Sequence, residues 1–253
     1  MHLLAAKPGG FSDDEGIVDL QQTPAKIVVL SAADSALFAL AETLDTLSED
    51  YPSVRLANWM NLTKPAAFDL YEASVLEQAE LIVLSLLGGK NYWQYGLERL
   101  VEWSTNTMLG KRRQLIVVPG DDALDQELID ASTVPTEEAV RVWRYFREGG
   151  THNTQQLMHF LASQYFGLPY QWHEPRVLPG CLLYMPSANR QSSQATYDEW
   201  THRWQQNKHN APIAMVLFYR SHLQSGNTAM FDALINGLEK QGLNPLPVAI
   251  SSL

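Results

Sequence analysis

Apolar and polar positions alternate along the first half of the chain in blocks that match the strands and helices of a parallel sheet. Four short runs are almost wholly apolar, and longer segments between them repeat apolar residues at helical spacing. The expected strands are Lys26 to Ser31, Val54 to Met60, Leu81 to Leu87 and Gln114 to Val118. Because this alternation is typical of a parallel sheet covered on both faces, it predicts a flavodoxin-like or Rossmann-like α/β domain over residues 1–168.

The middle of the chain combines helices with a proline-rich segment. From Thr136 the pattern predicts two helices, separated by Gly149 and Gly150, that close the first domain. Residues 169–211 are expected to form a linker with little regular structure. One helix is predicted within it, because Thr196 and Glu199 form a capping-box pattern ahead of two tryptophans. Leu182 to Tyr184 is also compatible with a short strand.

Residues 212–253 have the pattern of a strand, a helix and a second strand. Ile213 to Tyr219 is an unbroken apolar run, so we expect a strand buried on both faces. The side chains expected to form the apolar stripe of the helix are Met230, Ala233, Leu234, Gly237 and Leu238. Gly242 should end this helix, and Leu246 to Ile250 should return as a parallel strand through a right-handed connection. We expect this to be the first βαβ unit of a second, truncated α/β domain, because it lacks neighbouring strands.

Composition limits the class of protein. Apolar residues make up 45% of the 253 and charged residues 18%, which is typical of a folded globular chain. No apolar run approaches the ~18 residues needed to span a membrane. The formal net charge of −10 argues against nucleic-acid binding, which relies on clustered Lys and Arg. The lone Cys181 excludes a disulfide within the chain, and residues 1–10 lack the pattern of a secretory signal, so we expect a cytoplasmic protein.

The loop after Tyr219 carries the clearest candidate chemistry. Ligands of open α/β sheets bind at the carboxyl ends of strands, and this loop supplies a fixed cation at Arg220, an imidazole at His222 and a flexible backbone at Gly226. Asn227 and Thr228 precede the predicted helix, whose free N–H groups favour anions. This set suits an anionic or carboxamide-bearing ligand. The alternative is that Arg220 pairs with a carboxylate and the other residues only begin a helix.

A second candidate follows the strand that ends at Leu87. Gly88 and Gly89 could let backbone N–H groups approach a phosphate or carboxylate. The pattern is not a P-loop, because Lys90 is not followed by Ser or Thr, so we expect no ATP hydrolysis by this chain. Tyr92 and Trp93 could stack on a flat macrocycle, or could pack in the core as aromatic residues at helical spacing usually do.

Neither a metal site nor a catalytic residue is predicted. His152 and His159, like His202 and His209, are seven positions apart in the sequence. On a helix this spacing covers about 10 Å, too far for one ion with ligand bonds near ~2 Å. Asp121 and Asp122 follow the fourth strand and could orient a cation, although capping of the next helix is favoured. No Ser-His-Asp order, H-E-x-x-H or paired-carboxylate spacing stands out.

Several longer runs carry a family resemblance. They are Y-R-S-H-L-Q-S-G-N-T from Tyr219, D-A-L-I-N-G-L-E-K-Q-G-L-N-P-L-P from Asp232, L-L-G-G-K-N-Y-W-Q-Y-G-L-E-R-L from Leu86, V-V-P-G-D-D from Val117, and the opening M-H-L-L-A-A-K-P-G. Together they resemble the large subunit of cobaltochelatase, the CobN type, and more loosely the H subunit of magnesium chelatase. The matches lie at both ends and in the middle of the chain.

The resemblance implies a function. It implies the N-terminal part of a tetrapyrrole-binding large subunit that inserts Co²⁺ into hydrogenobyrinic acid a,c-diamide in cobalamin synthesis, a ligase forming nitrogen–metal bonds. ATP with Mg²⁺ would be used by two partner subunits, an AAA+ ATPase and an integrin-I-domain-like protein, and not bound by this chain. The residues expected to face the substrate are Arg220, His222, Gly226, Asn227 and Thr228, and secondly Gly88, Gly89, Tyr92 and Trp93. We expect this portion alone to be inactive.

Two alternatives stay open. The first is the magnesium chelatase H subunit, which performs the same type of reaction on protoporphyrin IX. The second is a non-catalytic module whose acidic surface docks the ATPase partners. The macrocycle that binds would distinguish the first alternative, and capture of the partners without any macrocycle would favour the second.

Overall fold

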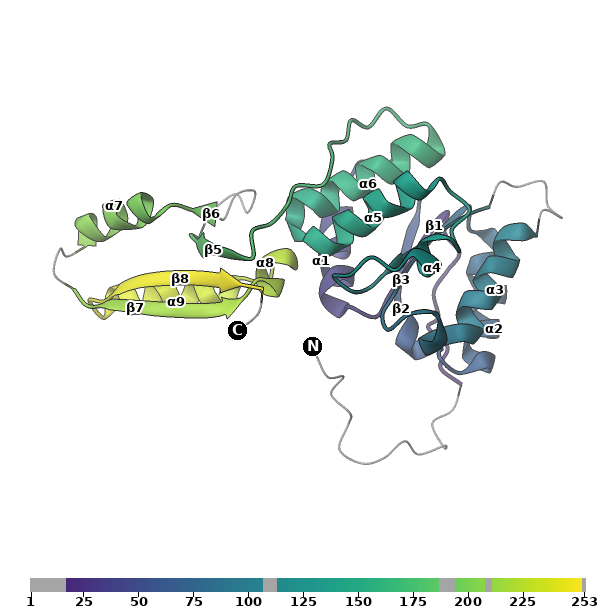
Figure 1. The fold of residues 1–253 in the computed structure, drawn as a ribbon, viewed down its shortest axis with the longest axis horizontal. Coiled ribbons are helices and arrows are strands. Elements are labelled where there is room, and N and C mark those ends of the chain that lie inside the picture. Colours follow the sequence, from purple (N-terminus) through teal and green to yellow (C-terminus); the bar gives the residue numbers. More distant parts are fainter. Residues whose placement is uncertain (1–16, 107–112, 187–193, 208–210, 252–253) are drawn as a thin grey trace.

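Two four-stranded sheets, each with its own helices, follow one another along the long axis of the molecule (Figure 1). The computed structural model describes residues 17–106, 113–186, 194–207 and 211–251. The opening M-H-L-L-A-A-K-P-G and His209 lie outside these residues. No helix in the described ranges is long and apolar enough to cross a membrane.

The α-helices and strands follow one another in this order: β1 (Ile27–Ser31), α1 (Asp34–Leu44), β2 (Val54–Asn58), α2 (Pro65–Ser74), β3 (Leu81–Leu86), α3 (Gln94–Thr105), β4 (Gln114–Pro119), α4 (Gln126–Ile129), α5 (Thr136–Glu148), α6 (Gly150–Phe166), β5 (Cys181–Tyr184), β6 (Gln194–Ala195), α7 (Tyr197–Asn207), β7 (Ile213–Tyr219), α8 (Ser221–Gln224), α9 (Ala229–Lys240) and β8 (Asn244–Ile250). Short 3₁₀ helices cover Trp59–Leu62, Leu76–Gln78 and Lys90–Trp93.

The first sheet confirms the predicted α/β class. Its order is β2-β1-β3-β4, and every pair is parallel. This is the order of the first four strands in flavodoxin-like sheets. The strands are apolar because both faces are covered: α2 and α3 pack on one face, and α1, α5 and α6 pack on the other. The predicted second strand was two residues too long, since Asn58 accepts a bond from Met60 N and begins a 3₁₀ turn.

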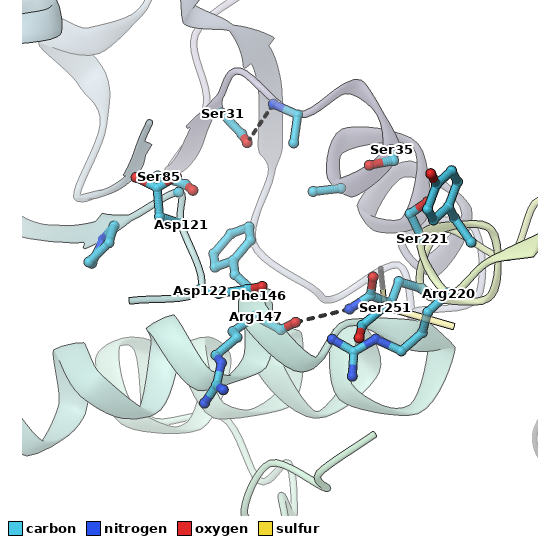
Figure 2. A pocket seen from close by; sticks show the side chains of 16 residues that line it. Ser31, Ser35, Ser85, Asp121, Asp122, Phe146, Arg147, Arg220, Ser221 and Ser251 are labelled. Atoms are coloured by element: carbon cyan, nitrogen blue, oxygen red, sulfur yellow. Dashed lines mark hydrogen bonds between the residues drawn. The ribbon is translucent and has the colours of Figure 1, made fainter. Parts of the chain in front are cut away.

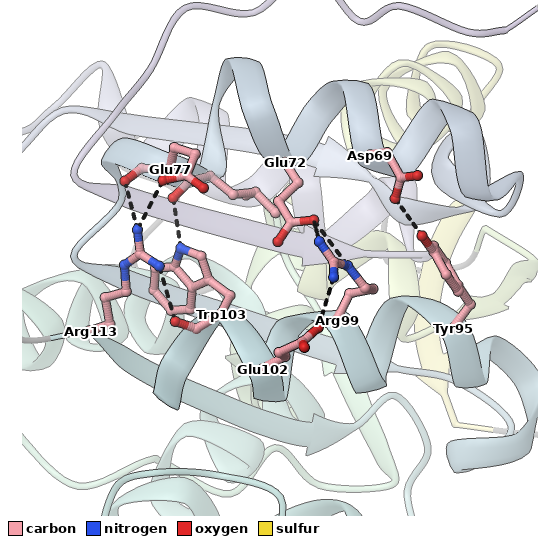
Figure 3. Close-up of polar contacts among 9 residues, drawn as sticks. Asp69, Glu72, Glu77, Tyr95, Arg99, Glu102, Trp103 and Arg113 are labelled. Carbon is pink, nitrogen blue, oxygen red and sulfur yellow. Dashed lines mark hydrogen bonds and ion pairs between the residues drawn. The ribbon is translucent and has the colours of Figure 1, made fainter. Parts of the chain in front are cut away.

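Ion pairs and hydrogen bonds tie α2 to α3 on the outer side of the first sheet (Figure 3). Arg99 donates to Glu72 at 2.6 Å and to Glu102 at 2.7 Å. Arg113 lies over the ring of Trp103 and donates to its carbonyl oxygen at 3.2 Å. The bond from Arg99 to Glu72 joins α3 to α2, and the other two contacts brace the end of α3.

The second sheet takes strands from the segment that we expected to be a linker. Its order is β6-β5-β8-β7, with β7 and β8 parallel and β5 antiparallel to β8. The compatible short strand at Leu182 to Tyr184 is therefore real, and α7 packs on the same sheet through indole bonds from Trp200 to Tyr184 O and from Trp204 to Pro245 O. The capping box is also confirmed, because Glu199 N–H donates to Thr196 Oγ1 at 3.2 Å. The division at residues 168 and 211 stays a prediction.

The expectation that β7 is buried on both faces was wrong. Val216 and Phe218 are buried, whereas Met215 and Leu217 on the other face are exposed. The reason is that β7 is an edge strand and that α7 and α9 cover the same face of its sheet. An apolar run cannot show how many of its faces have neighbours.

The apolar stripe of α9 was also predicted on the wrong side. Phe231 and Ile235 are the buried residues that face the sheet, while Met230 and Leu234 are exposed. Leu238 is partly buried against the same core. The helix carries apolar residues on two adjacent sides, so periodicity alone did not decide which side meets the sheet. Its end at Gly242 is as predicted, because this glycine has φ +78°.

The return strand β8 begins at Asn244, two residues before the predicted start, and so contains Pro245 and Pro247. Asn244 N–H donates toward β7, to Pro212 O at 2.9 Å. Because N–H groups alternate sides along a strand, both prolines lack an N–H on the side away from β7. On that side β5 pairs only with Val248 to Ile250. The prolines therefore remove no bond of the sheet.

Candidate functional site

A cavity of about 330 Å³ lies where the carboxyl ends of strands from both sheets meet (Figure 2). The first sheet contributes the ends of β1, β3 and β4, and the second contributes the ends of β7 and β8. Its lining residues are Ser31, Ala33, Ser35, Ala36, Ser85, Pro119, Gly120, Asp121, Asp122, Phe146, Arg147, Tyr219, Arg220, Ser221, Gln224 and Ser251. This is the position at which open α/β sheets bind ligands.

The wall from the first sheet is built of small and acidic residues. Ser31 ends β1, and its hydroxyl accepts a bond from Ala33 N–H at 3.1 Å. Gly120 lets the end of β4 approach its neighbour, because a Cβ there would lie 3.0 Å from Leu87 N. Asp121 follows, and its carboxylate accepts a 3.4 Å bond from Gly88 N–H. Asp122 lines the cavity beside it, so this wall carries two carboxylates, and Arg147 of α5 also belongs to the lining.

The opposite wall carries Arg220. Its Nη1 donates to Leu178 O at 2.6 Å and to Pro179 O at 3.4 Å. Among the described residues no carboxylate forms an ion pair with Arg220, whose acceptors are these two carbonyl oxygens, and the alternative of a carboxylate partner stays a prediction. Figure 2 shows Asp121 and Asp122 on one side of the cavity and Arg220 on the other. The cavity therefore presents carboxylate acceptors and a guanidinium donor across a small space.

Helix α8 positions the Arg220 wall by docking on the junction of α5 and α6. Gln224 Nε2 donates to Arg147 O and to Glu148 O, each at 3.0 Å. Gly149 at the junction has φ +59°, and a Cβ on it would lie 2.9 Å from Gln224 Cβ. The two sheets approach each other here because this residue has no side chain.

The remaining residues predicted in this loop lie outside the cavity lining. The His222 ring packs edge-on against Phe231, with ring centroids 4.9 Å apart. Gly226 has φ +70° and forms the turn before α9. Asn227 is exposed, and Thr228 is the N-cap of α9 but makes no side-chain capping bond. Of the five, the structure brings only Arg220 to the cavity, and the role of the others in substrate binding stays a prediction.

The second predicted set forms a separate corner next to the acidic wall. Gly88 and Gly89 both have positive φ, at 83° and 77°. Trp93 is buried and stacks on Trp59 at 5.1 Å, so its core-packing alternative is confirmed. Tyr92 is exposed and meets Trp59 edge-on at 5.9 Å. None of them lines the cavity; Gly88 touches it indirectly, through Asp121.

Sequence reasoning missed several cavity residues. A usable signal was present for three of them, because Ser31, Ser85 and Ser251 each stand at or next to the carboxyl end of a parallel strand. Small hydroxyl residues at these ends are available to a ligand. No such signal marked Arg147, which enters from the last turn of α5 through tertiary packing alone.

No metal site can be assembled from the described residues, since no group of three or more His, Cys, Asp or Glu side chains converges. The His152 side chain illustrates this. Its Nε2 is buried without a hydrogen-bond partner, and burial, followed by the charges of Arg176 and His173, lowers the pKa of its imidazole. It lies in the first turn of α6 and does not line the cavity.

Comparisons with known proteins agree with the motifs. Residues 143–253 match the family described as CobN/Magnesium Chelatase. The chain is 46% identical over 253 residues to the aerobic cobaltochelatase subunit CobN of Pseudomonas aeruginosa, and 35% identical over 259 residues to that of a Sinorhizobium species. All of this chain is aligned in both cases, but it spans only 19% and 20% of those relatives.

A solved structure shares the fold. The catalytic subunit of cobaltochelatase from Mycobacterium tuberculosis superposes with a TM-score of 0.61 at 25% identity. The match covers 89% of this chain and 16% of that one. Together with the family match and the identity to two relatives along the whole of this chain, these findings show that the chain belongs to the CobN/magnesium chelatase family.

Proposed function

We propose that this chain is the portion of a cobaltochelatase large subunit that binds the rim of the tetrapyrrole substrate. The reaction would be insertion of Co²⁺ into hydrogenobyrinic acid a,c-diamide, driven by ATP hydrolysis with Mg²⁺ on an AAA+ subunit and its integrin-I-domain-like partner. Support comes from the 46% identity along the whole chain to a subunit named for cobaltochelatase. Because the chain spans 19% of that relative, metal insertion is assigned to the complete subunit with its partners.

The observation that carries the proposal is the position of Arg220. Its guanidinium lines the cavity and is held by two carbonyl oxygens, at 2.6 and 3.4 Å, which orient it without neutralising its charge. An anionic or amide oxygen of a ligand would complete its donor set. Ser221 and Ser251 add hydroxyl groups on the same side.

The size of the cavity suggests which part of the substrate it takes. Its volume of about 330 Å³ is small for a macrocycle with its substituents, but is sufficient for peripheral side chains. Carboxylate side chains would pair with Arg220, and amide N–H groups would donate to Asp121 or Asp122 across the cavity. A corrin precursor that carries both carboxylates and amides fits both walls, whereas the two propionates of protoporphyrin IX would use one.

The test is an absorbance titration of the chain with hydrogenobyrinic acid a,c-diamide and, in parallel, with protoporphyrin IX. Arg220→Ala should weaken corrin binding about 10- to 100-fold, because a charged hydrogen bond contributes about 1.5–3 kcal/mol. Arg144→Ala is the matched control, since this arginine lies on α5 outside the cavity lining. Saturable binding lost only in Arg220→Ala supports the proposal.

The other outcomes separate the alternatives. Preferential binding of protoporphyrin IX would favour the magnesium chelatase reaction. Binding of neither macrocycle, together with capture of the ATPase partners, would assign the chain a docking role. Equal binding by wild type and Arg220→Ala would remove the cavity from substrate recognition.

A further inference from the structure

The second sheet has one covered face. Helices α7 and α9 both lie on it, and the buried side chains between sheet and helices form one cluster: Leu182, Tyr184, Ala195, Trp200, Trp204, Val216, Phe218, Leu223, Phe231, Ile235 and Ala249. All the side chains that β7 buries point toward this cluster. The opposite face has no helix among the described residues of this sheet.

That opposite face is apolar throughout. On β7 it exposes Ile213 by 54%, Met215 by 65%, Leu217 by 47% and Tyr219 by 41%. The register places Leu246, Val248 and Ile250 of β8 beside the last three of these, and Leu183 and Cys181 of β5 beside Val248 and Ile250. Leu246 and Leu183 are partly buried and also pack against the covered cluster, so we call the other seven residues the open face. Single exposed apolar residues are ordinary, but a contiguous set without a charge marks an interface.

The edge strand β7 also lacks the usual protection against further pairing. β7 is the last strand in the order β6-β5-β8-β7, and its seven residues IAMVLFY carry no charge and no proline. Proteins normally protect such an edge with charges, proline, a bulge or a covering segment. β7 has neither charges nor proline. We therefore expect another segment to cover both its edge and the open face.

The right-handedness of β-α-β crossovers indicates which element would cover the open face and the β7 edge. The connection from β7 through α9 to β8 moves across the sheet in one direction, with its helix on the covered face. A further parallel strand cannot pair with β8, whose two sides are taken by β7 and β5, and must pair with β7. Reaching it from β8 reverses the direction of travel. A right-handed crossover in the reverse direction places its helix on the opposite face.

We infer that the open face is the seat of a helix of the same subunit, in a crossover that follows β8 and ends in a strand paired with β7. The polypeptide for it exists in the relatives, in which this chain accounts for only 19% and 20% of the length. The occupant is intramolecular and amphipathic, with an apolar side facing Met215, Leu217 and Val248. A second copy of the chain or a separate protein is the competing occupant.

Cys181 is a built-in reporter, because it is the single cysteine of the chain, is exposed, and stands in the open face opposite Ile250. Its alkylation rate would be measured by mass spectrometry in two polypeptides. One is the 253-residue chain, and the other is a full-length subunit carrying this sequence in place of the matching fifth of the Pseudomonas aeruginosa relative. We expect alkylation to be at least about tenfold slower in the long polypeptide, as for a site that requires local opening. Equal rates in both would overturn the inference.

Leu217→Lys tests the face without relying on the thiol. In the long polypeptide it should lower the melting temperature and raise hydrogen exchange in β7, whereas in the 253-residue chain it should reduce self-association and leave folding intact. Leu70→Lys is the matched control, because Leu70 is exposed to a similar extent but lies on α2 of the first sheet. If Leu217→Lys instead dissociates an oligomer of the long polypeptide without lowering its melting temperature, the occupant is a second copy and the intramolecular helix is excluded.

Discussion

Glu148 and Arg220 hold the backbone of Leu178 from opposite sides. Glu148 Oε2 accepts the N–H of Leu178 at 2.9 Å, and Arg220 Nη1 donates to the carbonyl oxygen of the same residue at 2.6 Å. Glu148 ends α5 under the first sheet, and Arg220 follows β7 of the second. Leu178 lies in the segment that connects α6 to β5. Its backbone is hydrogen-bonded to both halves of the molecule, so the position of Arg220 in the cavity depends on this connecting segment.

Replacing Glu148 should destabilise the protein. Glu148→Ala leaves the partly buried N–H of Leu178 without its acceptor, which we expect to lower the free energy of unfolding by about 1 kcal/mol. Glu148→Gln keeps an oxygen in place and should lose less. Urea unfolding monitored by tryptophan fluorescence gives both values. Identical midpoints for wild type and Glu148→Ala would mean that this bond does not hold the connecting segment.

Gly149 and Gly150 offer a matched pair for the docking of α8. Both have positive φ, so alanine at either position strains the backbone by about 1 kcal/mol or more. Only at Gly149 would the new Cβ also meet Gln224, at 2.9 Å, whereas at Gly150 nothing lies within 4 Å. Gly149→Ala should therefore raise hydrogen exchange in α8 and weaken ligand binding at the cavity, while Gly150→Ala should not. Equal hydrogen exchange of α8 in the two variants would show that Gln224 accommodates the new Cβ without loosening the docking of α8.

The capping box of α7 should respond to both mutation and acid. Thr196→Ala removes an N-cap acceptor and should lower stability by about 1 kcal/mol. Two bonds from Thr196, one from its backbone N–H and one from its hydroxyl, lower the pKa of the Glu199 carboxyl. A lowered carboxyl pKa stabilises above the pKa of the unfolded chain, and this contribution is lost as pH falls through the folded value.

Hydrogen exchange of the α7 amides would follow this region, because the seven tryptophans of the chain are spread over both sheets. Titrating wild type and Glu199→Gln from neutral to acidic pH should show the wild type losing more stability. If the stability of wild type and Glu199→Gln fell equally with pH, the capping bonds from Thr196 would not lower the pKa of Glu199.

His152 should make the first sheet sensitive to mild acid. Because burial keeps the folded pKa of His152 below its ordinary value of 6.5, the unfolded chain binds a proton first as pH falls. Stability should therefore decrease once the pH drops below ~6.5. The melting temperature of His152→Gln should fall less over the same range, and the exposed His202→Gln serves as the control. If the melting temperature of the wild type changed with pH no more than that of His152→Gln, protonation of the buried imidazole would not destabilise the fold.

The first sheet was predictable because its strands are buried on both faces within the described chain. Leu81–Leu86 is apolar at every position except Ser85, and every position is buried, so pattern and environment agree. Ile213–Tyr219 has the same pattern but only one buried face. The difference lies in what packs outside the strand, which the strand itself does not encode.

The site was only partly predictable for a similar reason. Arg220 was found because it directly follows a strand, and chain order alone places it at the carboxyl edge. His222 is two residues later in the same loop, yet its ring packs against Phe231 and not toward the cavity. Arg147 reaches the cavity from a helix of the other sheet. Contacts between distant segments decide such positions, and local pattern does not register them.

Pro245 and Pro247 close the first half of β8, on its side away from β7, to an additional strand. An invading strand needs N–H donors, and on the side away from β7 these two residues offer carbonyls alone, one of which is already occupied by the Trp204 indole. Foreign chains are thus discouraged from adding beside the first half of β8 during folding, before any partner has arrived. The edge strand β7 contains no proline, so the two imino acids close one side of β8 and leave the β7 edge able to pair with a further strand.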